Sequence, residues 1–449
     1  MTTTRSIAVI GAGFSGTLLA VQLLRRAGPA DRIYLFDASA RIGRGLAYST
    51  GDSLHLLNVR VSNMSAFPDE PDHFLDWLHV NGARHGLPVP EPFSFVPRKV
   101  FGDYVGSLLR ETLWGEGKAR NFFLLNDEVV SIQDDSQGLR LVVDGGRSFR
   151  VDVAVLATGN EAENLRGSVY QRNPWSPAAL AGLEPDDAVL FIGSGLTMVD
   201  LATTLIERGH NGPLHALSRR GLLPQAHLPG ALAYPHLVPP VGASPLALLG
   251  WLRSEIGTLP ANGNWRDVVD ALRPYTQQIW LGWTTAQRAQ FLRHLRPYWE
   301  VRRHRMAPRI AKILSEARSR GQLRVHAGRI LDMKIDGSAA RVSFMARGGR
   351  GMHNLTVARI VDCTGPRTNY EAGAGRLLRG LMIAGLARPD PLRLGLDVDL
   401  NSAVIGRKGK ASGKLFAVGP VTRGTFWEII AVPDIRVQCA DLARYLTRG

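Results

Sequence analysis

The chain has 449 residues, which exceeds what a single hydrophobic core usually supports and predicts two or three domains. Its 54 Lys and Arg against 39 Asp and Glu give a formal net charge of +15, which favours anionic ligands or partners. The two cysteines, Cys363 and Cys439, exclude a disulfide framework and a CxxC site and fit a reducing cytoplasmic setting, and no segment resembles a membrane span or secretory signal.

The first predicted element is a buried strand over residues 7–10 that runs into glycines at Gly11, Gly13 and Gly16. This GxGxxG spacing allows a tight turn, a close backbone approach to a pyrophosphate, and close packing of a helix whose N-terminus favours phosphate. A second strand ends on Asp37, about 20 residues beyond Gly16, where a carboxylate can accept ribose hydroxyls. The pattern predicts a dinucleotide-binding βαβ unit, and the alternative is a βαβ unit that binds nothing.

A second strand-turn-helix pattern begins at residues 188–192 and continues through Gly193 and Gly195. It predicts a second dinucleotide site and therefore a redox enzyme. Met198 stands where a third glycine would be, so we expect helix and strand to pack less closely there.

Arginines rather than an acid follow the next predicted strand, which covers residues 214–217 and leads into Ser218, Arg219 and Arg220. Paired guanidiniums suit a 2′-phosphate better than a free ribose diol, so they favour NADPH over NADH. The alternative is a solvated loop that carries two surface arginines.

Between residues 222 and 320 the pattern turns helical and tryptophan-rich. We interpret this segment as a helical insertion that covers the active site, although aromatic residues at helical spacing also serve simple packing. Its most basic part, residues 293–309, interleaves arginines with His, Tyr and Trp. Such a segment could line an anionic pocket or bind a nucleic acid strand, and a solvated helix face is the plain alternative.

Two further apolar strands close on a Thr-Gly pair. Residues 151–156 lead into Ala157-Thr158-Gly159, and residues 358–363 lead into Thr364-Gly365, as if the chain returned to its first domain. We therefore expect an α/β fold with two Rossmann-like dinucleotide-binding domains, the first of them discontinuous, and a helical insertion. The predicted domains are residues 1–160, residues 161–355 with the insertion at about 222–320, and residues 356–449.

These features resemble the flavoproteins with two dinucleotide-binding domains, and specifically the bacterial FAD/NAD(P)-binding family that includes class B N-oxygenating monooxygenases. The resemblance spans nearly the whole chain. Residues 152–159 fit the DxxxLATG signature of N-hydroxylating monooxygenases, with Asn160 in place of the usual Tyr. The most specific segments are residues 43–48, 57–60, 64–68, 418–424 and 427–436.

The resemblance implies that the first glycine site holds FAD and the second holds NADPH. It also implies a helix that begins near Trp427 and directs its N-terminus at the flavin; the alternative for Trp427 and Glu428 is a buried cap residue and a helix-start acid. We predict cofactor contacts at Gly11, Gly13, Phe14, Ser15, Gly16, Asp37, Gly45, Asn58, Met64, Ser65, Val129, Ala157, Thr158, Gly159, Gly193, Gly195, Thr197, Ser218, Arg219, Arg220, Gly365, Gly419 and Trp427.

The predicted catalytic residues are Arg302, Arg303, Arg305, Arg423 and Trp427. The arginines are expected to position an anionic substrate and retained NADP+, because guanidinium groups bind carboxylates in a bidentate manner. No His, Cys or carboxylate spacing indicates a metal site.

The resulting hypothesis is a flavoprotein oxidoreductase, most simply a monooxygenase. NADPH would reduce FAD, oxygen would add to the flavin, and the hydroperoxide would oxygenate an amine, an amino-acid-like molecule or another anionic small molecule. A reductase without substrate oxygenation fits the same motifs. A flavin-binding sensor or RNA-associated flavoprotein is less favoured, because no recognised RNA-binding motif accompanies the charge. A homodimer is compatible with each hypothesis.

Overall fold

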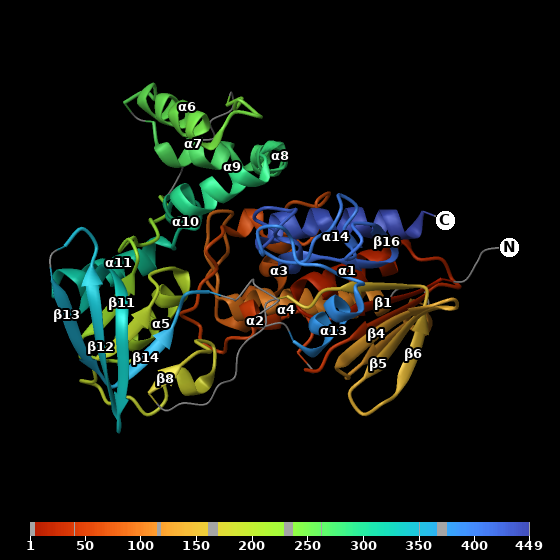
Figure 1. The fold of residues 1–449 in the computed structure, drawn as a ribbon, viewed down its shortest axis with the longest axis horizontal. Helices are drawn as coiled ribbons and strands as arrows, with labels where there is room; N and C mark the ends of the chain where they lie inside the picture. Colours follow the sequence, from red (N-terminus) through yellow and green to blue (C-terminus); the bar gives the residue numbers. More distant parts are fainter. Residues whose placement is uncertain are drawn as a thin grey trace.

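The computed structural model describes residues 5–39, 41–114, 118–159, 169–228, 237–261, 263–349, 351–365 and 375–448. Two domains built on β-sheets lie side by side, and a group of helices formed by residues 245–303 stands above them in Figure 1.

The first sheet takes strands from both ends of the chain. Its order is β15 (Ala403–Ile405), β16 (Ala411–Ala417), β7 (Val153–Leu156), β1 (Ser6–Ile10), β2 (Arg32–Phe36) and β3 (Phe122–Leu125). β1 pairs in parallel with β2 and β7, and β16 pairs in parallel with β7. The first domain is therefore discontinuous in sequence. A small antiparallel sheet packs against it and contains β4 (Val129–Asp135), β5 (Gly138–Val143) and β6 (Ser148–Val151).

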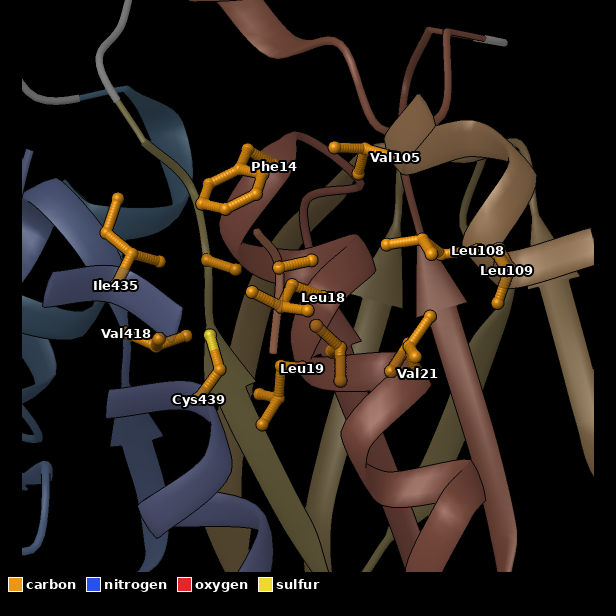
Figure 2. Packing of buried hydrophobic residues seen from close by; sticks show 14 of the residues in the cluster. Phe14, Leu18, Leu19, Val21, Val105, Leu108, Leu109, Val418, Ile435 and Cys439 are labelled. Carbon is orange, nitrogen blue, oxygen red and sulfur yellow. The ribbon is translucent and has the colours of Figure 1, made fainter. Parts of the chain in front are cut away.

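Helix α1 (Phe14–Arg26) is buried between α4 (Arg98–Trp114) and α14 (Val432–Thr447). Figure 2 shows Leu18 of α1 in this layer, with Ile435 of α14 on one side. The charged residues of α1 are confined to its last turn, so the rest of the helix can be buried without leaving a charge unpaired. This packing fixes the start of α1 at the end of β1. The other helices of this domain are α2 (Gly45–Tyr48), α3 (His73–Asn81) and α13 (Arg376–Ala384).

The second sheet carries the second glycine turn. Its order is β13 (Met352–Val357), β12 (Ala339–Ala346), β11 (Leu323–Asp336), β10 (Leu214–Ser218), β9 (Val189–Ile192), β14 (Arg359–Asp362) and β8 (Tyr170–Gln171). β14 pairs with β9 and β8, so the predicted return to the first domain at residue 356 is too early. An apolar strand that ends at a Thr-Gly pair can belong to either sheet. Only its pairing with neighbouring strands shows which sheet it joins. Asn160 and the predicted boundary at residues 160–161 lie outside the described residues.

The helical insertion has its own core. Trp280, Trp283 and Phe291 pack together in it, and Leu394 and Trp427 from the C-terminal part complete the cluster. Its helices are α6 (Pro245–Gly257), α7 (Trp265–Ala271), α8 (Thr276–Gly282), α9 (Thr285–Gln290), the π-helical residues Phe291–Leu295, and α10 (Arg296–Arg303). The next helix, α11 (Pro308–Ser319), packs with α5 (Leu196–Glu207) in the core of the second domain. The insertion therefore ends with α10, before the predicted limit near residue 320.

Cys363 and Cys439 are both free and buried. Among the described residues, no helix combines the length and the apolar character that crossing a bilayer requires, and no group of His, Cys, Asp and Glu is arranged to bind a metal ion.

Candidate active site

The turn after β1 contains glycines at positions where a side chain does not fit. Gly11 has a φ of 105°, and a Cβ there would lie 3.0 Å from the Ala157 carbonyl carbon and closer still to its oxygen. A Cβ on Gly16 would overlap the Gly11 carbonyl oxygen. These glycines bring the ends of β1 and β7 against the start of α1, as the dinucleotide-binding pattern requires.

The N-terminus of α1 has no side-chain cap. Its N-cap residue is Gly13, and its first turn, which begins with Phe14 and Ser15, contains no acid. The backbone of Gly45 lies against this turn, since a Cβ on Gly13 would be 3.4 Å from the Gly45 Cα. Free N–H groups and the positive end of the helix dipole are therefore available to a phosphate, and this fits the pyrophosphate of FAD.

Asp37 shapes the same turn from the end of β2. Its Oδ2 accepts a hydrogen bond from the Ala12 N–H at 2.6 Å, and its Oδ1 accepts from the N–H and hydroxyl of Ser39, both at 2.7 Å. Each carboxylate oxygen has about two acceptor positions. Oδ2 thus retains one for a ribose hydroxyl.

The turn after β9 repeats this design. Gly193 has a φ of 110°, and a Cβ there would lie 2.5 Å from the Cys363 carbonyl oxygen. Gly195 is the N-cap of α5, which has no side-chain cap and no acid in its first turn. Met198 is fully buried in the core of the second domain. The second helix N-terminus is therefore also free for a phosphate.

The end of β10 presents two guanidiniums beside this turn. Ser218 holds the backbone, because its hydroxyl accepts a hydrogen bond from Ser194 at 2.8 Å and from the Gly221 N–H at 3.0 Å. Arg219 is exposed, and the Arg220 guanidinium lies 5.5 Å from the centre of the Tyr298 ring. Both arginines line the cavity described next.

A cavity of about 600 Å³ lies where the two domains and the insertion meet. Both domains contribute to it, and α10 closes it on the insertion side. A space of this size can take a small ligand or the reactive ends of two cofactors. The lining residues used below are Tyr48, Asn58, Met64, Arg98, Gly195, Thr197, Ser218, Arg219, Arg220, Arg296, Glu300, Arg303, His304, Gly365, Arg423, Ile430, Ala431 and Val432.

Two of the lining arginines have a buried carboxylate partner. Arg303 Nε donates to Glu428 Oε2 at 3.1 Å, and both side chains are almost fully buried. Arg98 lies 2.8 Å from Asp200 of α5, so this ion pair joins the two domains. Burial raises the pKa of Asp200 to about 6, although Arg98 opposes the shift.

Glu428 occupies the left-handed backbone region with a φ of 63°, which is uncommon for a residue with a side chain. Its Oε1 also accepts a hydrogen bond from Trp299 Nε1 at 2.5 Å. Burial alone would raise the pKa of Glu428, but the nearby Arg303 and His304 outweigh burial and lower it. The carboxylate thus ties the C-terminal segment to α10 as a buried anion.

The imidazole ring of His304 also lines the cavity. Burial lowers the pKa of His304 to about 4, which is opposed by Glu428 and reinforced by nearby arginines. The ring is therefore neutral near pH 7 and presents one acceptor and one donor nitrogen.

The structure brings together only part of the predicted site. Of the predicted catalytic residues, Arg303 and Arg423 line the cavity. Arg302 is exposed on the outer side of α10, and Arg305 is buried in an ion pair with Asp270. Trp427 lies behind Arg423, stacked on Trp280 with ring centres 4.6 Å apart.

Only some of the predicted cofactor residues line the cavity. Those that line the cavity are Asn58, Met64, Gly195, Thr197, Ser218, Arg219, Arg220 and Gly365. Ser65 is turned away, because its hydroxyl donates to the Glu70 carbonyl oxygen at 2.6 Å, and Val129 is buried in the core beneath β4. Thr158 lies beside the first glycine turn, and its buried hydroxyl has no hydrogen-bond partner among the described residues. Gly419 lies against Ser15, at the start of α1.

The helix expected to begin near Trp427 begins later. α14 starts at Val432 after Ala431 as N-cap, because Glu428 has left-handed geometry and Pro433 fits the first helical turn. Ile430, Ala431 and Val432 line the cavity, so the start of α14 still faces it.

No sequence motif marks four of the lining residues, which are Arg98, Arg296, Glu300 and His304. The last three lie in the basic segment at residues 293–309, so composition signalled the region without indicating which helix face meets the cavity. Arg98 follows no motif, and only the tertiary fold brings it to the cavity.

Comparisons with known proteins agree with this architecture. Residues 8–161 match a family model described as FAD-NAD(P)-binding. An ornithine N-hydroxylase from Kutzneria sp. 744 is 14% identical, with a TM-score of 0.65 over 99% of each chain. An ornithine hydroxylase from Pseudomonas aeruginosa is 14% identical, with a TM-score of 0.66 over 99% of each chain.

An L-lysine 6-monooxygenase from Pseudomonas syringae is 17% identical, with a TM-score of 0.65 over 99% of each chain. The chain has the fold of these enzymes. The predicted fold class is confirmed, as is the resemblance to two-domain flavoproteins. The comparison with curated proteins gives no match.

Proposed function

We propose that the chain is an FAD-dependent, NADPH-consuming monooxygenase that oxygenates a small anionic substrate, such as an amine that also carries a carboxylate. The observation that supports this most is a cavity that residues of both domains line and that contains several arginines. Bound there, FAD and NADPH would supply hydride transfer and oxygen activation.

The residues of the chain itself would bind and orient the cofactors and the substrate, and they would exclude water. The free N-termini of α1 and α5 would each hold a pyrophosphate. Tyr48, Met64 and Val432 offer aromatic and apolar walls from the first domain, where a flavin ring would be kept out of water. Arg296 and Arg423 would hold anionic groups on the side of the cavity that faces the insertion.

The amine part of the proposal follows from the structural neighbours. These enzymes are named for ornithine and lysine, and a further neighbour from Erwinia amylovora is named as a cadaverine monooxygenase. The cationic lining indicates that the substrate also carries an acidic group, because a cavity with several arginines attracts anions.

Anaerobic stopped-flow reduction by NADPH, followed by mixing with oxygenated buffer, tests the function. We expect rapid bleaching of the flavin absorbance, then a transient band that belongs to neither oxidised nor fully reduced flavin and persists for seconds. Immediate reoxidation without this band would favour a reductase that does not oxygenate a substrate. No reduction by NADPH would exclude both functions.

Replacing Arg219 and Arg220 together by Gln should lower kcat/KM for NADPH about 10-fold to 100-fold, since two charge-assisted contacts to the 2′-phosphate are lost. Use of NADH should be nearly unchanged, because NADH lacks that phosphate. Steady-state flavin reduction with both cofactors measures the ratio. Arg309→Gln, at an exposed position of α11, is the control. An equal loss with NADH would contradict the assignment of these arginines.

A further inference from the structure

Two cavity arginines from different parts of the fold share one carboxylate. Arg296 of α10 lies 3.3 Å from Glu300, and Arg423, which precedes α14, lies 3.6 Å from the same Glu300 oxygen. All three side chains line the cavity. The cluster therefore combines two positive charges with one negative charge.

Each of the other lining arginines has a carboxylate partner or a position suited to a dinucleotide phosphate. Arg303 has Glu428, and Arg98 has Asp200. Arg219 and Arg220 lie at the end of β10, beside the free N-terminus of α5, where they suit a dinucleotide phosphate. Among the described lining residues, the excess positive charge facing the insertion side belongs to Arg296 and Arg423.

Arg423 is held ready for a ligand. Its side chain is only 13% exposed, and its guanidinium lies 4.8 Å from the centre of the Trp427 ring. Trp427 is in turn stacked on Trp280. The Nε–H groups of both Arg296 and Arg423 make no hydrogen bond within the described parts of the chain, although Arg296 Nε lies 3.3 Å from Glu300 Oε1. Protein groups therefore satisfy neither guanidinium fully. A guanidinium fixed in this way loses little conformational entropy when it binds an oxyanion.

We propose that Arg296 and Arg423 form the subsite for a carboxylate of the substrate, and that Glu300 competes with that carboxylate for them. An incoming carboxylate would bring the cluster to two positive and two negative charges. The subsite rests on the proposed function in that it treats this cavity as the place where the substrate binds. It selects substrates that carry an acid over the corresponding simple amines.

The test uses the oxidised FAD-loaded protein without NADPH, so its result does not depend on flavin reduction. The probes are L-lysine against cadaverine and L-ornithine against putrescine, because each pair differs by one carboxylate. Dissociation constants come from calorimetry, with quenching of tryptophan fluorescence as a second signal, since Arg423 lies over Trp427. We expect the acid of at least one pair to bind at least 10-fold more tightly than its amine.

Two substitutions should act in opposite directions. Arg423→Gln should weaken binding of the acid about 10-fold to 100-fold, since one charge-assisted contact is lost, and should leave the simple amine unchanged. Glu300→Gln should tighten binding of the acid, because the competing charge is removed. If this pair served only the fold, both substitutions would change binding in the same direction, which would overturn the subsite. Arg309→Gln, at an exposed position of α11, is the matched control.

Three further outcomes would overturn the proposal: no acid binds better than its amine, Arg423→Gln keeps the full difference, or Arg423→Gln weakens NADP+ instead of the acid. The last outcome would assign the arginines to a dinucleotide phosphate. A failed flavin reduction with intact discrimination between acid and amine would reject the monooxygenase but not the subsite.

Discussion

Valine in place of Gly16 should give a protein that purifies without flavin and unfolds at a clearly lower temperature. A Cβ at this position would overlap the Gly11 carbonyl oxygen and lie 3.1 Å from the Ala157 Cβ, so the turn must open. Because the obstacle is backbone, we expect a loss of about 3 kcal/mol or more in the free energy of unfolding. The ratio of flavin to protein absorbance and thermal unfolding measure the two effects.

Gly250→Ala is the matched control for this substitution. Gly250 lies inside α6, and a Cβ there would meet no atom within 4 Å. Alanine should therefore be neutral or stabilise the protein by up to about 1 kcal/mol, with normal flavin content. A Gly16→Val protein with full flavin content and unchanged unfolding would contradict the packing seen at this turn.

The second large effect is expected for Glu428→Gln. The variant keeps the shape of the side chain but leaves Arg303 buried without a counter-charge, which typically costs about 3–5 kcal/mol. Urea unfolding near pH 7 measures this loss. Adding Arg303→Met should recover much of it, because neither member of the pair then carries a charge. If the double variant is as unstable as the single one, the ion pair is not the cause.

The contribution of Glu428 to stability should decrease as the solution becomes acidic. The pKa of Glu428 in the folded chain lies below its usual value of 4.5. Its stabilising contribution is therefore present above about pH 4.5 and is lost as the pH falls through the folded-state pKa. The gap between the parent protein and Glu428→Gln should narrow in acid. Asp441→Asn removes an exposed ion pair with Arg444 and should change stability by less than about 1 kcal/mol.

The dinucleotide turns could be predicted from sequence because their signals are local. Gly11 and Gly193 mark left-handed backbone directly after a strand, and no distant contact is needed to see this. The alternation of strands and helices around them was sufficient for the fold class.

The cavity lining could not be predicted in the same way. Arg302, Arg303 and Arg305 are close in sequence, yet they end on the surface, at Glu428 and at Asp270, respectively. Which side of α10 faces the cavity depends on how the insertion packs around Trp280 and Trp427, and this packing joins residues far apart in the chain. The charge pattern of the segment carries no such information.

The start of α14 at Val432 had a signal in the sequence, but the apolar residues before it suggested an earlier start. Residues 427–432 are mostly apolar and suggest an early helix start, whereas Pro433 marks the first turn of α14. The left-handed geometry of Glu428 is fixed by its buried partners and has no sequence signature.

The discontinuous first domain has a consequence for biosynthesis. β8 to β14 are contiguous along the chain, so the second sheet is complete once residue 362 has left the ribosome. β16 and α14 emerge last, although the glycine turn they close is translated first. Until then, the face of α1 that packs on α14 is uncovered, including Leu19, which is fully buried in the finished protein. The nascent chain therefore exposes an apolar helix for most of its translation, and chaperones are expected to bind it there.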